Sequence, residues 1–205
     1  GLTQGFSIQL SQYYGAKDFE NLRKSLAHSY RLTAFIAAGV LILSQSFASL
    51  VLTGLHTPSN IIGMSLLYLR IIFCGIPATA AYNMFASALR AMGNSKTPLT
   101  AMIIASVLNV SLDILFVAGF GWGVAGAAIA TVIAQSFSAV YCFLILRRID
   151  IVHLTRADFM PASGMNARLM KLGIPVVFQN IIIGVCGLVV QYVINGYGFL
   201  FVAGF

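Results

Sequence analysis

Long apolar segments alternate with short polar connections along almost the whole chain. The first apolar segment covers residues 1–14, and complete ones follow at 32–52, 69–89, 99–118, 124–146 and 174–194. An α-helix rises about 1.5 Å per residue, so roughly 20 apolar residues cross the hydrocarbon of a bilayer. The pattern therefore predicts an all-α polytopic membrane protein that folds as a helical bundle. Because the chain opens inside an apolar segment, we expect a fragment of a longer protein.

Glycine and proline residues mark the ends of several predicted helices. Gly15 and Gly93 lie where a helix would end in a left-handed C-cap. Thr97 and Pro98 have the order of an N-cap followed by proline in the first turn. Pro77 lies inside an apolar segment, so we expect it to kink that helix.

The charged residues give the bundle an orientation. Hydrophobic residues make up 59% of the 205 positions and charged residues only 8%, a profile typical of a multi-pass membrane protein. Eleven of the twelve Lys and Arg residues fall in alternate connections on one side: Lys17, Arg23, Lys24, Arg31, Arg90, Lys96, Arg147, Arg148, Arg156, Arg168 and Lys171. The positive-inside rule assigns that side to the cytoplasm. Topology thus explains the net charge of +7, and no nucleic-acid partner is expected. Arg70 is the exception, and we expect it to snorkel to the outer interface.

One connection is much longer than the others. Residues 147–171 are expected to form a cytoplasmic hinge between two helical bundles. The last part of this linker, 166–171, has the composition of a short amphipathic turn lying on the membrane surface. His28 and His153 are expected to be solvated in cytoplasmic loops, and His56 in an outer loop.

Neither cysteines nor histidines form a recognisable metal site. Cys74, Cys142 and Cys186 are widely spaced in apolar segments, so we expect them to pack as small hydrophobic side chains. The histidines lack metal-ligand spacing. The GWGVAG motif at 121–126 lacks the preceding strand and later acidic residue of a dinucleotide site. No Ser/His/Asp or Cys/His set lies at one membrane depth, so we expect neither an enzyme nor a resident cofactor.

A single acidic residue lies inside the apolar segments. Asp113 occurs in the stretch NVSLDILF, where an unpaired carboxylate near the bilayer centre costs at least a few kcal/mol. Such residues usually face a bundle interior or a water-filled cavity and act there. Asn109 lies four residues earlier on the same helix face. Thr131 lies at a similar depth in the next helix, when residues are counted from the turn at Gly121.

These three side chains can offer an amide oxygen, a carboxylate and a hydroxyl to one site. Hard oxygen ligands suit Na+, and the carboxylate alone suits a proton. We therefore predict a cation site for H+ or Na+ at Asp113, Asn109 and Thr131. A structural role stays open for each of them, as a hydrogen-bonding residue between helices or, for Thr131, as a donor to a carbonyl one turn back.

Several stretches resemble the multidrug and toxic compound extrusion (MATE) family. They are SQYYGAKDFENLRKSLAHS, YLRIIFCGIPATAAYNMFASALRAMGNSKTP, LNVSLDILFVAGFGWGVAGAAIATVIAQ and LMKLGIP. Members of that family have twelve spans in two six-helix lobes joined by a cytoplasmic linker. The resemblance implies that residues 1–146 hold the second to sixth helices of the N-terminal lobe. Residues 147–171 would then be the linker, and residues 172–205 the start of the C-terminal lobe with its first helix.

The resemblance also implies roles for the three polar residues. Asn109 and Asp113 match an Asn and an Asp of the fifth helix that bind a cation in one prokaryotic branch of the family, and Thr131 matches a Thr of the sixth. A further Asp of the first helix would precede residue 1. By this resemblance Asp113 accepts H+ or Na+, and Asn109 and Thr131 are auxiliary ligands.

The function implied by the resemblance is secondary active transport. A monomer in the bacterial plasma membrane would export organic cations or amphiphiles by H+ or Na+ antiport with alternating access, with no cofactor besides the coupling ion. Its partners would be that small molecule and the lipid bilayer. Three alternatives stay open: a lipid-linked oligosaccharide flippase of the same superfamily, a structural or assembly membrane protein, and an intramembrane enzyme.

Overall fold

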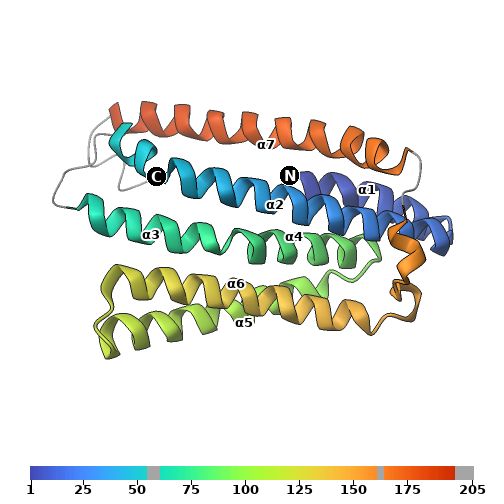
Figure 1. Ribbon diagram of the computed structural model, residues 1–205, viewed down its shortest axis with the longest axis horizontal. Helices are drawn as coiled ribbons and strands as arrows, with labels where there is room; N and C mark the ends of the chain where they lie inside the picture. Colours follow the sequence, from blue (N-terminus) through green and yellow to red (C-terminus); the bar gives the residue numbers. More distant parts are fainter. Residues whose placement is uncertain (55–60, 161–163, 197–205) are drawn as a thin grey trace.

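The described part of the chain is a bundle of long helices. The computed structural model describes residues 1–54, 61–160 and 164–196, and within these ranges it contains helices and no strands (Figure 1). The α-helices are α1 (Leu2–Gly15), α2 (Phe19–Gly54), α3 (Ile62–Cys74), α4 (Ile76–Ala91), α5 (Lys96–Asp113), α6 (Gly123–Arg147) and α7 (Met165–Gly196). A π-helical segment, η1 (Ile114–Gly119), and two short 3-10 helices, η2 (Asp150–Val152) and η3 (Arg156–Phe159), complete the elements. The all-α prediction is confirmed.

Five helical stretches of the described residues are long and apolar enough to cross a membrane. They are Phe19–Gly54, Ile62–Ala91, Lys96–Gly119, Gly123–Arg147 and Met165–Gly187. The first four contain the predicted segments 32–52, 69–89, 99–118 and 124–146, and the fifth overlaps the predicted segment 174–194. The helices extend beyond the apolar residues, and α2 reaches 36 residues. The hydropathy pattern marks only the apolar residues of each span. The backbone hydrogen bonds of the helix continue into the polar residues beyond them. Arg70, expected at the opening of a span, lies two turns inside α3 and is exposed.

Helix α4 lies at the centre of the bundle. It contacts α1 and α2 on one side and α5 and α6 on the other, and α7 packs on α1 and α2. Figure 1 shows these helices running side by side along the longest axis. The α1–α7 crossing is close because glycines meet there: a Cβ on Gly5 would lie 2.4 Å from the Gly173 Cα. No other residue type permits that approach.

The second membrane span is interrupted near the predicted kink. Helix α3 ends at Cys74, and α4 starts at Ile76, so that Pro77 occupies the first turn of α4. Proline is tolerated there because the first N–H groups of a helix have no intrahelical acceptor. Gly75 lies at the break, and a Cβ at this position would come within 2.9 Å of the Val132 Cγ2 of α6. The interruption therefore lies where α6 crowds the backbone.

The predicted helix caps are partly wrong. Gly93 follows α4 with a φ of +83°, as expected, but Gly15 lies inside α1 and Lys17 takes the left-handed conformation with a φ of +58°. Helix α5 has Ser95 rather than Thr97 as its N-cap residue, and the Asn94 Oδ1 accepts a hydrogen bond from the Thr97 amide at 3.1 Å. A helix start is capped by the polar side chain that reaches a free backbone N–H, and several polar residues near the start of α5 could do so.

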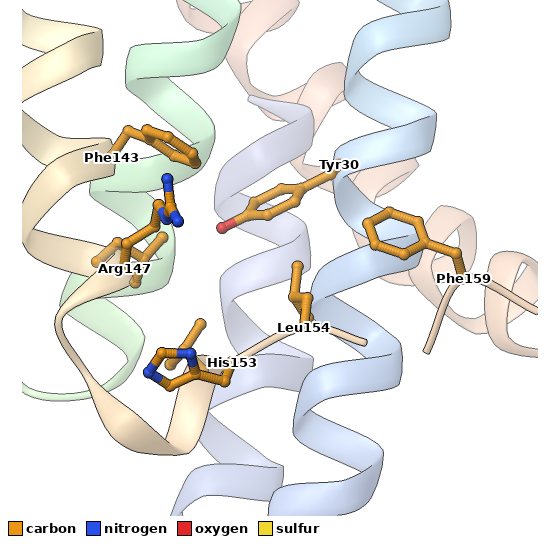
Figure 2. A pocket seen from close by; sticks show the side chains of 8 residues that line it. Tyr30, Phe143, Arg147, His153, Leu154 and Phe159 are labelled. Atoms are coloured by element: carbon orange, nitrogen blue, oxygen red, sulfur yellow. The ribbon is translucent and has the colours of Figure 1, made fainter. Parts of the chain in front are cut away.

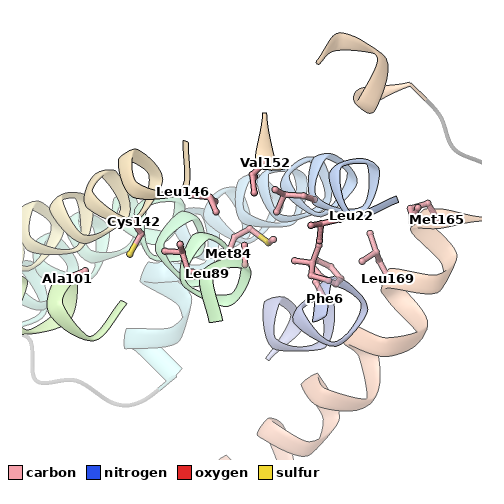
Figure 3. Packing of buried hydrophobic residues seen from close by; sticks show 13 residues of the cluster. Phe6, Leu22, Met84, Leu89, Ala101, Cys142, Leu146, Val152, Met165 and Leu169 are labelled. Atoms are coloured by element: carbon pink, nitrogen blue, oxygen red, sulfur yellow. The ribbon is translucent and has the colours of Figure 1, made fainter. Parts of the chain in front are cut away.

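One end of the bundle, which the positive-inside rule assigns to the cytoplasm and which we call the cytoplasmic end, has a well-packed apolar core. Residues of α1, α2, α4, α6 and α7 meet in it, among them Phe6, Leu22, Met84, Leu146 and Leu169 (Figure 3). Val152 of the linker and Met165 at the start of α7 are buried in the same cluster. The predicted amphipathic turn at 166–171 is therefore wrong as a separate element. These residues begin α7, and Leu169 is buried in the core rather than lying on the membrane surface.

The linker is held to α2 by hydrogen bonds, which we call the linker clasp. The ring of His28 in α2 is only 1% exposed, so the prediction of a solvated loop histidine is wrong. Its Nδ1 lies 2.8 Å from the Asn166 Oδ1, and its Nε2 lies 3.1 Å from the Met160 carbonyl oxygen. The Arg31 guanidinium donates to the Phe159 carbonyl at 3.0 Å. His153 is exposed, as expected, whereas His56 lies outside the described residues.

Among the cysteines, only the environment of Cys142 matches a packed core residue. Cys142 is buried in the cytoplasmic core, whereas Cys74 and Cys186 are exposed on α3 and α7. All three are free thiols.

Candidate cation site

A tight hairpin between α5 and α6 positions the predicted site. The π-helical segment η1 continues α5, and a Cβ on Gly126 of α6 would lie only 2.9 Å from the Phe116 Cβ of η1. Phe116, Phe120 and Trp122 form an aromatic cluster at the turn, with the Phe116 and Trp122 ring centroids 5.1 Å apart. Small residues of α6 thus let the two helices approach, and aromatic rings close the outer end.

The helix changes its hydrogen-bond pattern directly after Asp113. Helix α5 ends at Asp113, and η1 runs over the next six residues, with the Phe120 amide donating to the Leu115 carbonyl at 2.9 Å. The sequence predicted an uninterrupted helix over 99–118, so this change is a correction. Short π-helical segments are rare and occur frequently at functional sites. The sequence does not indicate the π-helical segment, because the apolar pattern of these residues fits an α-helix and a π-helix equally well.

The structure brings Asn109 and Thr131 together. Asn109 Nδ2 donates to the Thr131 Oγ1 at 3.4 Å, and the Thr131 hydroxyl donates to the Ala127 carbonyl at 3.0 Å. Both residues are half-buried between α5 and α6. The counting of residues from the turn therefore placed this pair correctly. The Thr131 bond to a carbonyl one turn back is also the structural alternative, and the ligand role of both residues stays a prediction.

Asp113 has an unusual environment for a carboxylate. Its Oδ1 is fully covered and has no hydrogen-bond partner among the described residues. Buried polar atoms are normally paired, because an unpaired one loses its hydration without compensation. Asp113 shares the α5 face with Asn109, one turn farther along the helix. An uncompensated, covered oxygen of this kind is suited to bind a proton or a small cation.

A polar cavity lies next to the Asn109–Thr131 pair, between α4, α5 and α6. Its volume is about 380 Å³, and its polar lining comprises Thr79, Tyr82, Asn83, Ser106, Asn109, Thr131, Gln135 and Ser138. Asp113 does not line it. The expected convergence of three side chains is thus seen for two of them around this cavity.

Six polar residues of this cavity were missed as site candidates, among them Thr79, Asn83 and Gln135. The Thr79 hydroxyl donates to the Gln135 side-chain oxygen and so links α4 to α6. Asn83 Nδ2 donates to the Thr79 carbonyl at 2.9 Å. Thr79 and Asn83 stand four residues apart in an apolar helix, so this i, i+4 polar pair was a readable signal. Within the described residues no group of three or more His, Cys, Asp or Glu side chains could hold a metal ion.

Taken together, the fold and the cavity define a multi-pass helical membrane protein with polar side chains gathered inside the membrane region. The MatE family model matches residues 1–115 of the chain. The chain belongs to the MatE family. The resemblance seen in the sequence is thereby confirmed.

Relatives in this family are multidrug exporters by name. The chain is 32% identical over 205 residues to "Probable multidrug resistance protein YpnP" of Bacillus subtilis, covering 100% of this chain and 46% of that protein. It is 25% identical to "Multidrug export protein MepA" of Staphylococcus saprophyticus, covering 98% and 45%. The crystal structure of a MATE protein in the straight conformation matches with a TM-score of 0.86 at 23% identity, covering 97% of this chain and 44% of that one. The chain thus spans less than half the length of these relatives.

Proposed function

We propose that this chain is part of a secondary active transporter of a bacterial plasma membrane, which exports organic cations or amphiphilic drugs in exchange for H+ or Na+. The observation that carries the proposal is the covered, unpartnered Oδ1 of Asp113, one helical turn from the Asn109–Thr131 pair. A carboxylate kept in this state gains a partner when a cation binds. The printed names of the relatives, multidrug resistance and multidrug export proteins, support the direction and class of transport.

In this proposal Asp113 is the acceptor of the coupling ion. Asn109 and Thr131 would add neutral oxygen ligands, with no cofactor besides the ion, in a monomer that rocks between inward-open and outward-open states. Coupling requires that ion and drug differ in their affinity for these two states. We further propose that 1–146 belongs to one lobe, 147–171 to the linker and 172–205 to the second lobe.

The test uses the complete transporter that contains this chain. Asp113→Asn removes the charge and keeps the size of the side chain, so the variant should bind a fluorescent organic cation but lose ion-driven efflux from proteoliposomes by about tenfold or more. Separate pH and sodium gradients identify the ion. Ser111→Ala is the matched control, because the exposed Ser111 hydroxyl bonds only the Val107 carbonyl of its own helix. Unchanged ion-driven efflux by Asp113→Asn refutes the assignment.

A further inference from the structure

A second polar pocket lies at the cytoplasmic end of the bundle. It is formed by α2, α6 and the linker segment between η2 and η3, and its volume is about 300 Å³. Tyr30, Arg147 and His153 supply its polar groups, while Phe143 and Phe159 are aromatic walls. Figure 2 shows the Tyr30 hydroxyl pointing toward the side of the pocket that Arg147 lines. None of these residues takes part in the candidate cation site.

Arg147 brings a positive charge to this pocket, and no carboxylate of the described residues forms an ion pair with it. Its guanidinium carbon lies 5.7 Å from the centroid of the Phe143 ring, which holds it at the pocket wall. In the ranges that the structure describes, the ion pairs involve Arg23, Lys24 and His153, and none involves Arg147. The pocket is therefore electrostatically suited to an anion.

An apolar groove continues from this pocket along the membrane region. It has a volume of about 390 Å³ and shares Tyr30 and Phe143 with the polar pocket. Its walls are mainly small or apolar side chains of α2 and α4: Ala34, Ala37, Ala38, Leu41, Ala80 and Met84. The alanine side chains of α2 are too small to fill the space between α2 and α4, so an apolar groove remains between the two helices. The apolar groove and the positively charged pocket together are complementary to an amphiphile that has an apolar chain and one anionic end.

We propose that this composite site binds an anionic phospholipid of the cytoplasmic leaflet. The phosphate would accept hydrogen bonds from the Arg147 guanidinium and the Tyr30 hydroxyl, and an acyl chain would occupy the groove between α2, α4 and α6. The cytoplasmic leaflet carries the anionic lipids of the membrane, and the cytoplasmic ends of these helices carry most of the cations of the chain. A free phosphate would leave the groove empty, which is why the site fits a lipid better than an inorganic anion.

The experiment measures lipid binding to the complete, delipidated transporter in detergent and does not depend on transport. Phosphatidylglycerol should raise the midpoint of thermal unfolding, and phosphatidylcholine should raise it much less. Arg147→Gln should weaken the apparent affinity for phosphatidylglycerol by about tenfold, the effect of losing a charge-assisted hydrogen bond. Arg148→Gln is the matched control, since Arg148 is exposed like Arg147 but does not line the pocket. Equal losses in the two variants would mean diffuse surface attraction and would overturn the proposal.

Two further variants test the two halves of the site separately. Tyr30→Phe removes only the hydroxyl and should weaken binding of phosphatidylglycerol severalfold, which keeps the test valid if Arg147→Gln fails to fold. Ala38→Phe fills the groove from an exposed position of α2 and should weaken the long-chain lipid while leaving glycerol phosphate unaffected. Competition by glycerol phosphate at the affinity of the lipid, or equal stabilisation by phosphatidylcholine, contradicts the proposal.

Discussion

Two titratable side chains of this protein, the buried His28 and the half-buried Asp113, differ sharply in their surroundings. His28, at the cytoplasmic end, has both ring nitrogens within hydrogen-bond distance of an acceptor, in Asn166 and Met160. Asp113, in a membrane-spanning segment, has one covered oxygen without a partner. A group whose polar atoms are all satisfied stabilises the fold, whereas an unsatisfied one costs stability and is kept for another reason. The comparison separates a structural residue from a candidate functional one.

The packing around the two residues differs in the same way. His28 lies beside a core of large apolar side chains, including Phe6, Leu26 and Leu169, which packs like the interior of a soluble protein. Asp113 lies where α5 and α6 approach through small residues, and many apolar side chains of these helices are exposed on the outside of the bundle. The cytoplasmic end therefore contributes most of the conventional packing of the described chain.

The largest expected effect concerns this core. Phe6→Ala should lower the free energy of unfolding by about 3 to 5 kcal/mol, because it removes a fully buried aromatic ring where α1, α2 and α7 meet. Thermal unfolding of the complete protein in detergent measures the loss. Ile8→Ala on the same helix is the control, since Ile8 is 40% exposed and should cost far less. Similar losses for both variants would remove the contrast between the cytoplasmic core and the lipid-facing surface.

A paired substitution tests the contrast between His28 and Asp113 directly. His28→Leu should lower the free energy of unfolding by about 2 kcal/mol, because the Asn166 side-chain amide and the Met160 carbonyl lose the imidazole ring as their partner. Asp113→Leu should leave the stability unchanged or raise it, because it removes an oxygen that is already unpaired. Both values come from the same unfolding assay. Destabilisation of the Asp113 variant as large as that of the His28 variant would assign Asp113 a structural role.

The smallest expected effect is a pH dependence of the linker around Asp158, whose carboxylate lies 3.9 Å from the Arg23 Nε of α2. Burial alone would raise the pKa of Asp158, but hydrogen bonds from Thr155 and the charges of Arg23 and Lys24 outweigh it and hold the pKa below its ordinary value of 3.8. A depressed folded-state pKa stabilises the folded protein at pH values above 3.8, and this contribution is lost as the pH falls through the folded-state value. The protection of the linker amides against hydrogen exchange, relative to their intrinsic exchange rates, should therefore fall as the pH drops below 3.8.

Asp158→Asn is the control for that measurement. The amide cannot titrate, so linker exchange in the variant should lack this acid-dependent step. If the wild type and the variant show the same pH profile, another group causes the opening and Asp158 does not stabilise the linker through its charge.

The membrane-spanning segments were predictable because lipid imposes a long apolar pattern on every span. The Asn109–Thr131 contact was predictable for a similar reason, since a short turn fixes the relative depth of two antiparallel helices. The π-helical segment after Asp113 and the helix break at Gly75 could not be predicted, because an apolar sequence is compatible with several backbone hydrogen-bond patterns. The role of His28 was also hidden, because its acceptors lie more than 130 residues away in the chain.

By itself, the sequence determined the helical membrane class and the presence of one costly carboxylate in the spans, and it predicted the orientation of the bundle. These properties depend only on the polarity of the residues and on their spacing along the chain, so they can be predicted without knowing any tertiary contact. Only the tertiary structure decided that the linker residues join α2 and α7, that polar residues of α4 border the cavity beside Asn109, and that the Asp113 Oδ1 is left without a partner. Those features arise where distant segments meet, and hydropathy along one chain carries no information about which segments do so.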